Sequence, residues 1–261
     1  MLDPITRRLV GSAAAASPLV LMYHALEDGA RARWRWAVTR QAFAAQLDLL
    51  QELGCVTPTV SELVATPAPA KRSVAITFDD GYVDNLAAAE ELRRRGMRAT
   101  WYVVVGCLGH RPGWKADGGP TDRLMSASEL RELQAAGMEI GSHTMSHQRL
   151  TSLAAGRRQD EIEASRTMLE DALGSPVHAF AYPYGDFDAD SAAAVRAAGY
   201  SSACTTQPGW ALRDGDAFRI RRLSVFNDDG TARFARKLAF ASHDAGWSGV
   251  ARYAWRRLRH G

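Results

Sequence analysis

The chain has few lysines, few cysteines and little net charge. Of its 32 basic residues only Lys71, Lys115 and Lys237 are lysines, and the basic residues exceed the 29 acidic ones by a net charge of +3. So small an excess gives no sign of a nucleic-acid partner. Cys55, Cys107 and Cys204 are far apart and odd in number, so the sequence predicts neither a disulfide framework nor a cysteine metal site.

Long apolar runs are also lacking. The sequence holds no stretch of about 18 apolar residues of the kind that spans a bilayer. Residues 7–22 imitate a signal peptide, but Gly11, Ser12, Ser17 and Pro18 interrupt the apolar part. We therefore expect no signal peptide and a place in the cytoplasm or at the inner face of the membrane.

The end of the chain is basic. Arg252, Arg256, Arg257 and Arg259 alternate with aromatic and aliphatic residues at the helical period, within a helical extension predicted over about 229–260. The pattern is typical of a helix that packs on the domain and exposes a basic face. It also fits peripheral contact with an anionic membrane surface, and the oligomeric state is left open.

The rest of the sequence alternates between helical and strand-like segments. Gly54, Gly96, Gly137 and Gly199 each end a helical segment and precede a strand, as a left-handed glycine does. The predicted helices are 40–53, 83–95, 127–136, 156–173 and 187–198, and the predicted strands are 19–23, 55–57, 73–78, 99–105, 138–140, 178–182, 200–204 and 219–225. The 261 residues therefore predict one α/β domain with a mostly parallel sheet, open or closed.

Two carboxylates follow the strand at 73–78. Asp79 and Asp80 lie where parallel α/β folds build active sites, and as neighbours they point in different directions. Followed by Gly81, the same pair is also typical of a helix N-cap and a turn.

Two histidines and a turn follow later strands. His143 and His147 are four apart, a spacing that lets two imidazoles bind one metal, although isolated histidines are more often surface or core residues. With a strand-end aspartate they make an open metal site of a common kind. Pro183 and Gly185 indicate a tight turn that can present the Tyr184 N–H to an oxyanion.

Three segments of the sequence resemble, in their order, motifs of the polysaccharide deacetylases, carbohydrate esterase family four. They are residues 77–81 (TFDDG), 143–147 (HTMSH) and 183–185 (PYG). The resemblance covers about residues 18–226. It implies a distorted, incomplete (β/α) barrel of about seven mostly parallel strands. It also implies hydrolysis of N-acetyl, sometimes O-acetyl, groups on sugars at a divalent metal.

The resemblance assigns roles to residues. It implies that Asp80, His143 and His147 bind the metal, that Asp79 is the general base, and that the Tyr184 N–H holds the oxyanion. Zn²⁺ suits this ligand set best, with Co²⁺ and Ni²⁺ as alternatives.

The sequence departs from the family pattern in two places. Ala181 stands where the family usually has an arginine that orients the catalytic aspartate, and Arg222 is our candidate substitute, or else a surface arginine. The usual C-terminal Leu-x-His motif is absent. His24, which ends the first strand, is the candidate general acid, since it resembles the permuted histidine of poly-N-acetylglucosamine deacetylases; the alternative is a capping or core histidine.

Aromatic residues in predicted loops are candidates for sugar contact. Trp34, Trp36 and Trp114 are of this kind, and Trp114 lies in the long Gly/Pro-rich loop 108–124, so we predict that Trp114 and Pro183 contact the substrate. The predicted partner is an acetylated glycan. The leading hypothesis is removal of N-acetyl groups from a polysaccharide, oligosaccharide or lipid-linked sugar during exopolysaccharide or cell-surface glycan synthesis. The alternatives are an O-acetyl esterase and a catalytically weak carbohydrate-binding homologue.

Overall fold

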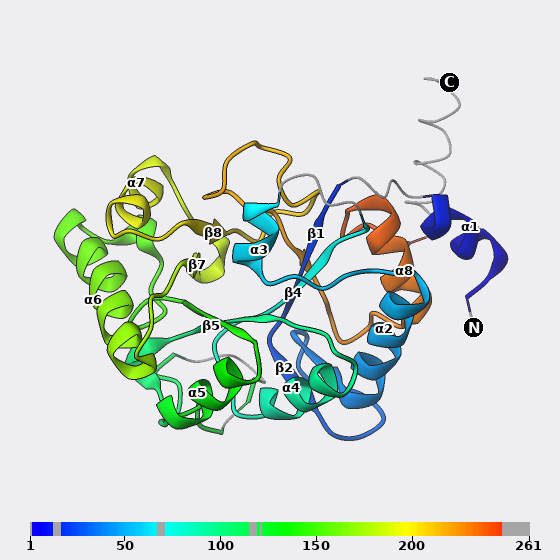
Figure 1. Cartoon of the computed structure of the whole chain (residues 1–261), viewed down its shortest axis with the longest axis horizontal. Helices are drawn as coiled ribbons and strands as arrows, with labels where there is room; N and C mark the ends of the chain where they lie inside the picture. The colour runs from blue at the N-terminus through cyan, green and yellow to red at the C-terminus, as the bar shows by residue number, and fades with distance from the viewer. Residues whose placement is uncertain (1, 13–16, 67–70, 115–118, 121, 247–261) are drawn as a thin grey trace.

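A seven-stranded parallel sheet forms the centre of the computed structural model, which describes residues 2–12, 17–66, 71–114, 119–120 and 122–246 (Figure 1). Its strands in spatial order are β8 (Ser202–Cys204), β7 (Ala179–Ala181), β6 (Glu139–Ser142), β5 (Thr100–Val103), β4 (Val74–Phe78), β1 (Leu19–Tyr23) and β9 (Leu223–Ser224). Most strand residues are buried, as expected for a parallel sheet covered on both faces. The predicted α/β class with about seven parallel strands is confirmed.

The sheet curls into an incomplete barrel. Its edge strands β8 and β9 do not pair along their length, but Cys204 at the end of β8 makes an isolated parallel bridge to Ile220. The predicted strand 219–225 is therefore shorter than expected, and its first part only touches β8. The segment after Ile220 then carries Arg222 to the mouth of the barrel.

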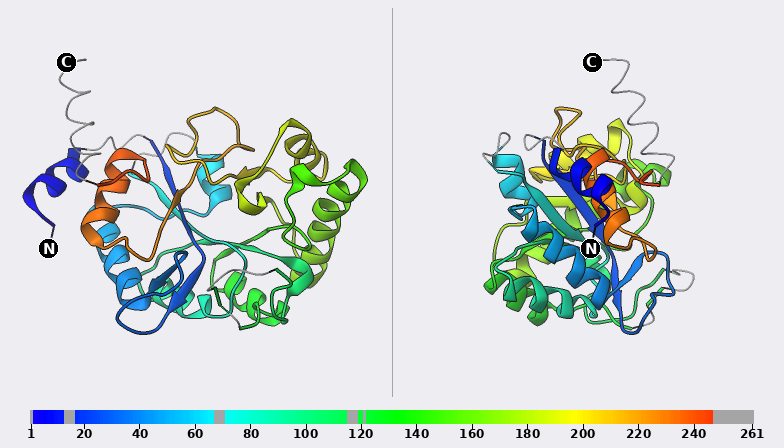
Figure 2. Two further views of the ribbon diagram at one scale, coloured as in Figure 1. Left: turned by 180° about the vertical axis from the view of Figure 1, so that it is seen from behind. Right: turned by 90° about the vertical axis from the view of Figure 1, so that its right-hand side faces the viewer.

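Helices surround the sheet on the outside (Figures 1 and 2). They are α1 (Pro4–Ser12), α2 (Arg40–Glu52), α3 (Val60–Ala65), α4 (Asn85–Arg94), α5 (Ala127–Ala135), α6 (Ala155–Leu173), α7 (Ala189–Ala197) and α8 (Thr231–Phe240). The four helix-ending glycines have φ between 65° and 86°, which confirms the predicted left-handed positions.

Sequence periodicity missed several short elements. These are α1, α3 and a two-stranded parallel sheet of β2 (Ala25–Glu27) and β3 (Ala37–Thr39). The predicted strand 55–57 is wrong, because only Val56 bridges to Ser73 and Thr59 already caps α3 after Pro58. A single pairing residue between a helix end and a proline leaves no room for a ladder.

The C-terminal region begins with α8, which packs against α1 and ends at Ala241 in a left-handed conformation. The basic residues 252–259 lie outside the described residues, as does the part of the predicted extension from residue 247 on. No helix in the described part of the chain is long and apolar enough to cross a membrane.

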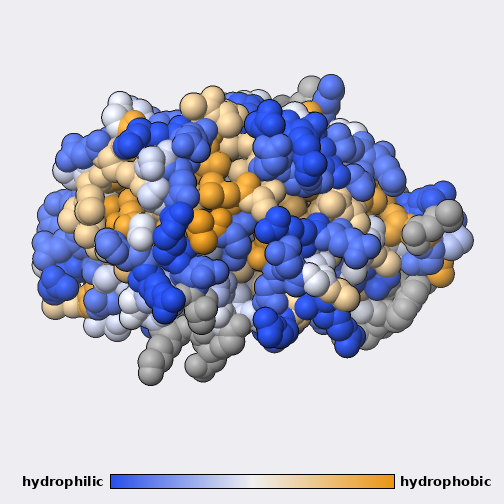
Figure 3. Space-filling view, turned by 90° about the horizontal axis from the view of Figure 1, so that it is seen from below, coloured by the Kyte–Doolittle hydropathy of each residue, from blue (hydrophilic) through white to orange (hydrophobic). Residues whose placement is uncertain are grey.

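On the face of the molecule shown in Figure 3, apolar residues gather near the middle among hydrophilic ones.

Candidate functional site

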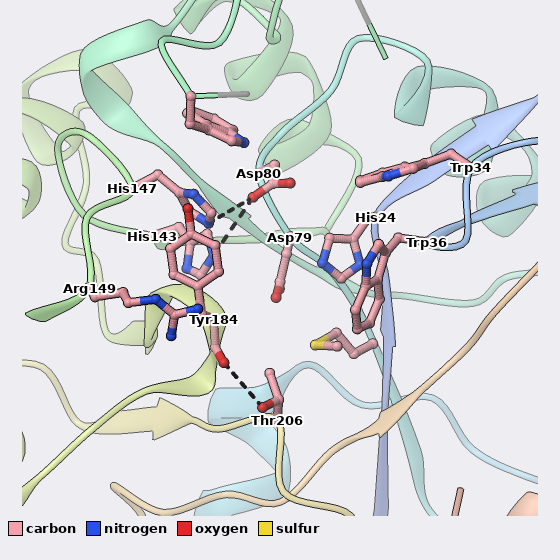
Figure 4. Close-up of a pocket in the computed structure, with 12 residues that line it drawn as sticks. His24, Trp34, Trp36, Asp79, Asp80, His143, His147, Arg149, Tyr184 and Thr206 are labelled. Carbon is pink, nitrogen blue, oxygen red and sulfur yellow. Dashed lines mark hydrogen bonds and ion pairs between the residues drawn. The ribbon is translucent and has the colours of Figure 1, made fainter. Parts of the chain in front are cut away.

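The carboxyl ends of β1, β4 and β6 bring the predicted site residues together. His24 follows β1, Asp79 and Asp80 follow β4, and His143 follows β6. Their side chains meet in a cavity of about 460 Å³ (Figure 4). The residues that line it are Met22, His24, Trp34, Trp36, Asp79, Asp80, Trp114, His143, His147, Arg149, Tyr184 and Thr206.

Asp80, His143 and His147 form a cluster suited to a metal ion. Asp80 Oδ1 lies 3.7 Å from His143 Nε2 and 3.4 Å from His147 Nε2, and one ligand atom from each residue lies within 4.8 Å of the others. His143 Nδ1 donates to the Ala181 carbonyl at 2.7 Å, which fixes the tautomer and leaves the Nε2 lone pair free. Asp80 Oδ1 is buried without a hydrogen-bond partner. The arrangement therefore fits a divalent cation that these three residues would share.

The electrostatics of the cluster also favour a cation. Burial, together with the charge of Asp79, raises the pKa of Asp80 to about 8. Burial lowers the pKa of His143, and burial and His143 lower that of His147 to about 2. Both imidazoles are thus neutral donors, and the buried Asp80 carboxylate lacks a compensating charge.

Backbone strain concentrates in the same loops. Of the described non-glycine residues, Asp80, Thr144, His147, Tyr184 and Ala241 have positive φ, and the first four belong to the three motifs. Each such position costs on the order of 1–3 kcal/mol, which is typical of functional sites. The fold therefore holds these loops in backbone conformations that their residues disfavour in isolation.

Asp79 lies beside the cluster in a buried ion pair with Arg222. The guanidinium donates from Nη1 to Oδ1 at 2.6 Å and from Nη2 to Oδ2 at 2.8 Å. Arg222 also donates to the Thr77 hydroxyl and to the Thr205 carbonyl, and its side chain is fully buried. Burial alone would raise the pKa of Asp79, but the charge and hydrogen bonds of Arg222, together with the nearby His143 and His24, outweigh burial and hold the pKa at about 2. Arg222 is therefore not a surface arginine, and Asp79 stays ionised.

His24 lies on the other side of Asp79 from the two metal-site histidines (Figure 4). Its ring packs 5.0 Å from the Trp36 ring and edge-on against Trp34 at 5.9 Å. Burial lowers its pKa to about 4. The two tryptophans thus form an apolar wall around His24.

The PYG turn covers the metal-site histidines. The exposed Tyr184 ring packs 4.6 Å from the ring of His147, and Trp114 packs on His147 at the same separation. A Cβ at Gly185, where φ is 68°, would collide with Thr206, so this turn requires glycine. Trp114 lines the cavity, whereas Pro183 is buried and is not among the lining residues; contact of either residue with the substrate stays a prediction.

Sequence reasoning missed Met22, Arg149 and Thr206, which also line the cavity. Met22 and His24 are two apart and so share a side of the first strand, which was a usable signal. Arg149 follows His147 by two residues in an irregular loop, and no periodicity reports on such a position.

Comparison with known proteins places the chain among deacetylases. A sequence model described as polysaccharide deacetylase matches residues 66–203, more than half of the chain. The poly-beta-1,6-N-acetyl-D-glucosamine N-deacetylase of Staphylococcus epidermidis is 26% identical over 242 residues, covering 81% of this chain and 80% of that protein.

Solved structures agree. IcaB from Ammonifex degensii matches with a TM-score of 0.73 and 25% identity, over 87% of this chain and 97% of that one. A polysaccharide deacetylase from Bacillus cereus matches with a TM-score of 0.72 and 25% identity, over 85% of this chain and 69% of that one. With the ordered motifs gathered in one cavity, this chain belongs to the polysaccharide deacetylase family.

Proposed function

We propose that the protein is a metal-dependent hydrolase that removes N-acetyl groups from a polysaccharide, oligosaccharide or lipid-linked sugar during exopolysaccharide or cell-surface glycan synthesis. The observation that carries the proposal is the buried Asp80, His143 and His147 cluster beside an ionised Asp79 in one cavity. The similarity to the Staphylococcus epidermidis enzyme supports an N-acetylated glycan as the substrate.

Asp80, His143 and His147 would hold the metal, with Zn²⁺ as the best match and Co²⁺ or Ni²⁺ as alternatives. A divalent cation in this position supplies the charge that polarises an acetyl carbonyl and acidifies water. The protein's own residues carry out the proton transfers and hold the oxyanion.

Asp79 takes the proton of the attacking water. Its pKa of about 2 keeps it ionised, and the two hydrogen bonds from Arg222 fix the direction of its carboxylate. Arg222 thus performs from another strand end the orienting role that the family gives to an arginine at the position of Ala181.

His24 delivers a proton to the departing amine. Burial lowers its pKa to about 4, so the ring is neutral at pH 7 and first takes up a proton from water; once protonated, it is a strong acid, which helps an amine to leave. The Tyr184 N–H, in the strained turn at the cavity wall, is the proposed donor to the oxyanion.

The test is acetate release from N-acetylglucosamine oligomers by metal-stripped protein, with and without added Zn²⁺ or Co²⁺. The proposal requires release that depends on the metal. No release from oligomers or from a generic acetyl ester, by protein that binds one metal equivalent, would instead favour the carbohydrate-binding alternative.

O-deacetylation is the second candidate, and the neutral state of His24 at pH 7 favours it, because an ester needs less help to protonate its leaving group. A His24→Ala variant separates the two activities. We expect it to lose activity on amides and to keep it on esters. Equal loss on both substrates would contradict the role of His24 as an amide-specific acid.

A further inference from the structure

The cavity continues into a second hollow on the side of His147. This hollow, about 530 Å³, shares Trp114, His147, Arg149 and Tyr184 with the first cavity. The two therefore form one groove that extends beyond the residues around the metal site, with room next to the sugar unit that is deacetylated. Besides the shared residues, Cys107, Gly113, Ser146, Gln148 and Ser152 line the second hollow.

Arg149 is the charged residue of this hollow. Among the described residues that line it, no other side chain carries a formal charge, since His147 is neutral. The Arg149 guanidinium lies 4.1 Å from the centroid of the Tyr184 ring, in a cation–π contact. A guanidinium stacked in this way keeps its N–H edge available for a planar anion.

The partner of Arg149 within the chain is a weak one. Its Nη1 lies 3.4 Å from Asp186 Oδ2, whereas charge-assisted hydrogen bonds are about 2.7–2.9 Å long. The same Asp186 oxygen accepts a closer hydrogen bond, 2.7 Å, from Thr151. The Arg149 side chain is also 53% exposed. Its charge is thus only partly compensated by the protein.

The other residues of the groove do not compensate the charge of Arg149 either. Arg222 neutralises Asp79, and Asp80 points at the two histidines, where a divalent cation would more than balance its charge. The groove therefore has a net positive potential whose exposed source outside the metal site is Arg149.

We propose that Arg149, stacked on Tyr184, binds an oxyanion carried by the sugar unit next to the one that is deacetylated. The preferred substrate is then an acetylated glycan with a carboxylate or a phosphate on that neighbouring unit. This inference rests on the proposed function and adds to it the class of glycan.

The experiment compares three oligosaccharides of equal length. One is a neutral N-acetylglucosamine oligomer, one alternates N-acetylglucosamine with glucuronic acid, and one carries a phosphate beside the acetylated unit. KM and kcat come from acetate release by the metal-loaded enzyme. The Kd of each oligosaccharide is measured in parallel by calorimetry on the same proteins with Asp79→Asn added, which should keep the metal but lack the base, so that binding is measured without turnover.

For the wild-type protein we expect KM and Kd about tenfold lower for one charged oligosaccharide than for the neutral one, the size of one charge-assisted hydrogen bond. Whichever oligosaccharide shows the decrease identifies the anion as carboxylate or phosphate. Arg149→Gln should remove the difference while kcat stays within about twofold, and Arg149→Lys should retain part of it, because lysine keeps the charge but not the fork.

Two further variants complete the design. Arg157→Gln, an exposed arginine of α6 that lines neither hollow, is the matched control and should change nothing. Asp186→Asn should lower KM and Kd for the charged oligosaccharide, since it removes the acidic group that competes for Arg149.

Equal Kd values for all three oligosaccharides would overturn the inference. So would an Arg149→Gln variant that weakens neutral and charged oligosaccharides alike, because that result shows a structural role. Metal-dependent acetate release from the neutral oligomer would leave the proposed function intact in either case. Absence of release from all three would refute the proposed function, while the Kd values would still decide the role of Arg149.

Discussion

Two buried ion pairs in this protein have similar chemistry and different surroundings. Asp79 lines the cavity and Arg222 lies beside it, outside the lining residues, with side chains 3% and 0% exposed. Asp229 and Lys237 lie between α8 and β9, with side chains 0% and 1% exposed. In the second pair, Lys237 also donates to the Ser224 carbonyl, and Asp229 Oδ2 accepts from the Phe226 N–H.

The difference lies in what each carboxylate faces. Asp79 lines the cavity beside Asp80 and His24, whereas neither Asp229 nor Lys237 lines it. Burial of a charge pair is therefore not evidence of function by itself. A pair acquires a chemical role where one partner can reach a substrate, and elsewhere it fixes packing.

Among the variants that test this comparison of the two pairs, Arg222→Gln should show the largest effect. Turnover at pH 7 should fall about 100-fold, and stability by about 3–5 kcal/mol because Asp79 stays buried without its partner. The pKa of Asp79 should rise, since burial then loses the strongest charge that opposes it, so the acid limb of the pH–rate profile should move to higher pH. An unchanged profile would show that Arg222 does not control the ionisation of Asp79.

Lys237→Met tests the other pair. We expect a loss of stability of at most about 3–5 kcal/mol, because Asp229 loses its buried partner and keeps only the partly exposed Arg233, whose Nε lies 3.2 Å from Asp229 Oδ1. Turnover per folded molecule should stay within about twofold of the wild-type rate, since the pair is outside the cavity. Chemical denaturation measures the stability and acetate release the turnover, both on the same preparation. A loss of turnover comparable to that of Arg222→Gln would contradict the distinction between the two regions.

Thr77→Val should show the smallest effect on stability. The Thr77 hydroxyl accepts from Arg222 Nη1 at 3.1 Å and donates to the Leu21 carbonyl at 2.8 Å. Its removal should cost about 1 kcal/mol of stability and a few-fold in turnover, because the guanidinium keeps its two bonds to Asp79. An effect on turnover as large as that of Arg222→Gln would mean that Thr77, and not the ion pair alone, orients the base.

The fold was predictable from the sequence where the pattern is repeated. Glycines 54, 96, 137 and 199 ended helices as expected. The short elements were not predictable in the same way. Strands of three residues such as β2 and β3, and the single bridge at Val56, depend on neighbours that are distant in sequence.

The candidate site also has a part that the sequence predicted and a part that it did not. The motifs predicted which strand ends would meet, and His24, Asp79, Asp80, His143 and His147 do line one cavity. The geometry of Arg222 could not be derived, because its contact with Asp79 spans 143 residues and depends on how the barrel closes. Arg149 was not predicted as a site residue for another reason. Its role depends on its stacking on the Tyr184 ring, which the sequence does not show.

The central claim is that the adjacent aspartates divide the chemistry, with Asp80 binding the metal and Asp79 acting as the base. The most direct test measures bound metal equivalents and acetate release on the same samples of wild-type, Asp79→Asn and Asp80→Ala protein. We predict that Asp79→Asn keeps one equivalent while turnover falls about 10³-fold, and that Asp80→Ala loses both metal and turnover. One equivalent retained by Asp80→Ala, or wild-type turnover in Asp79→Asn, would contradict the account.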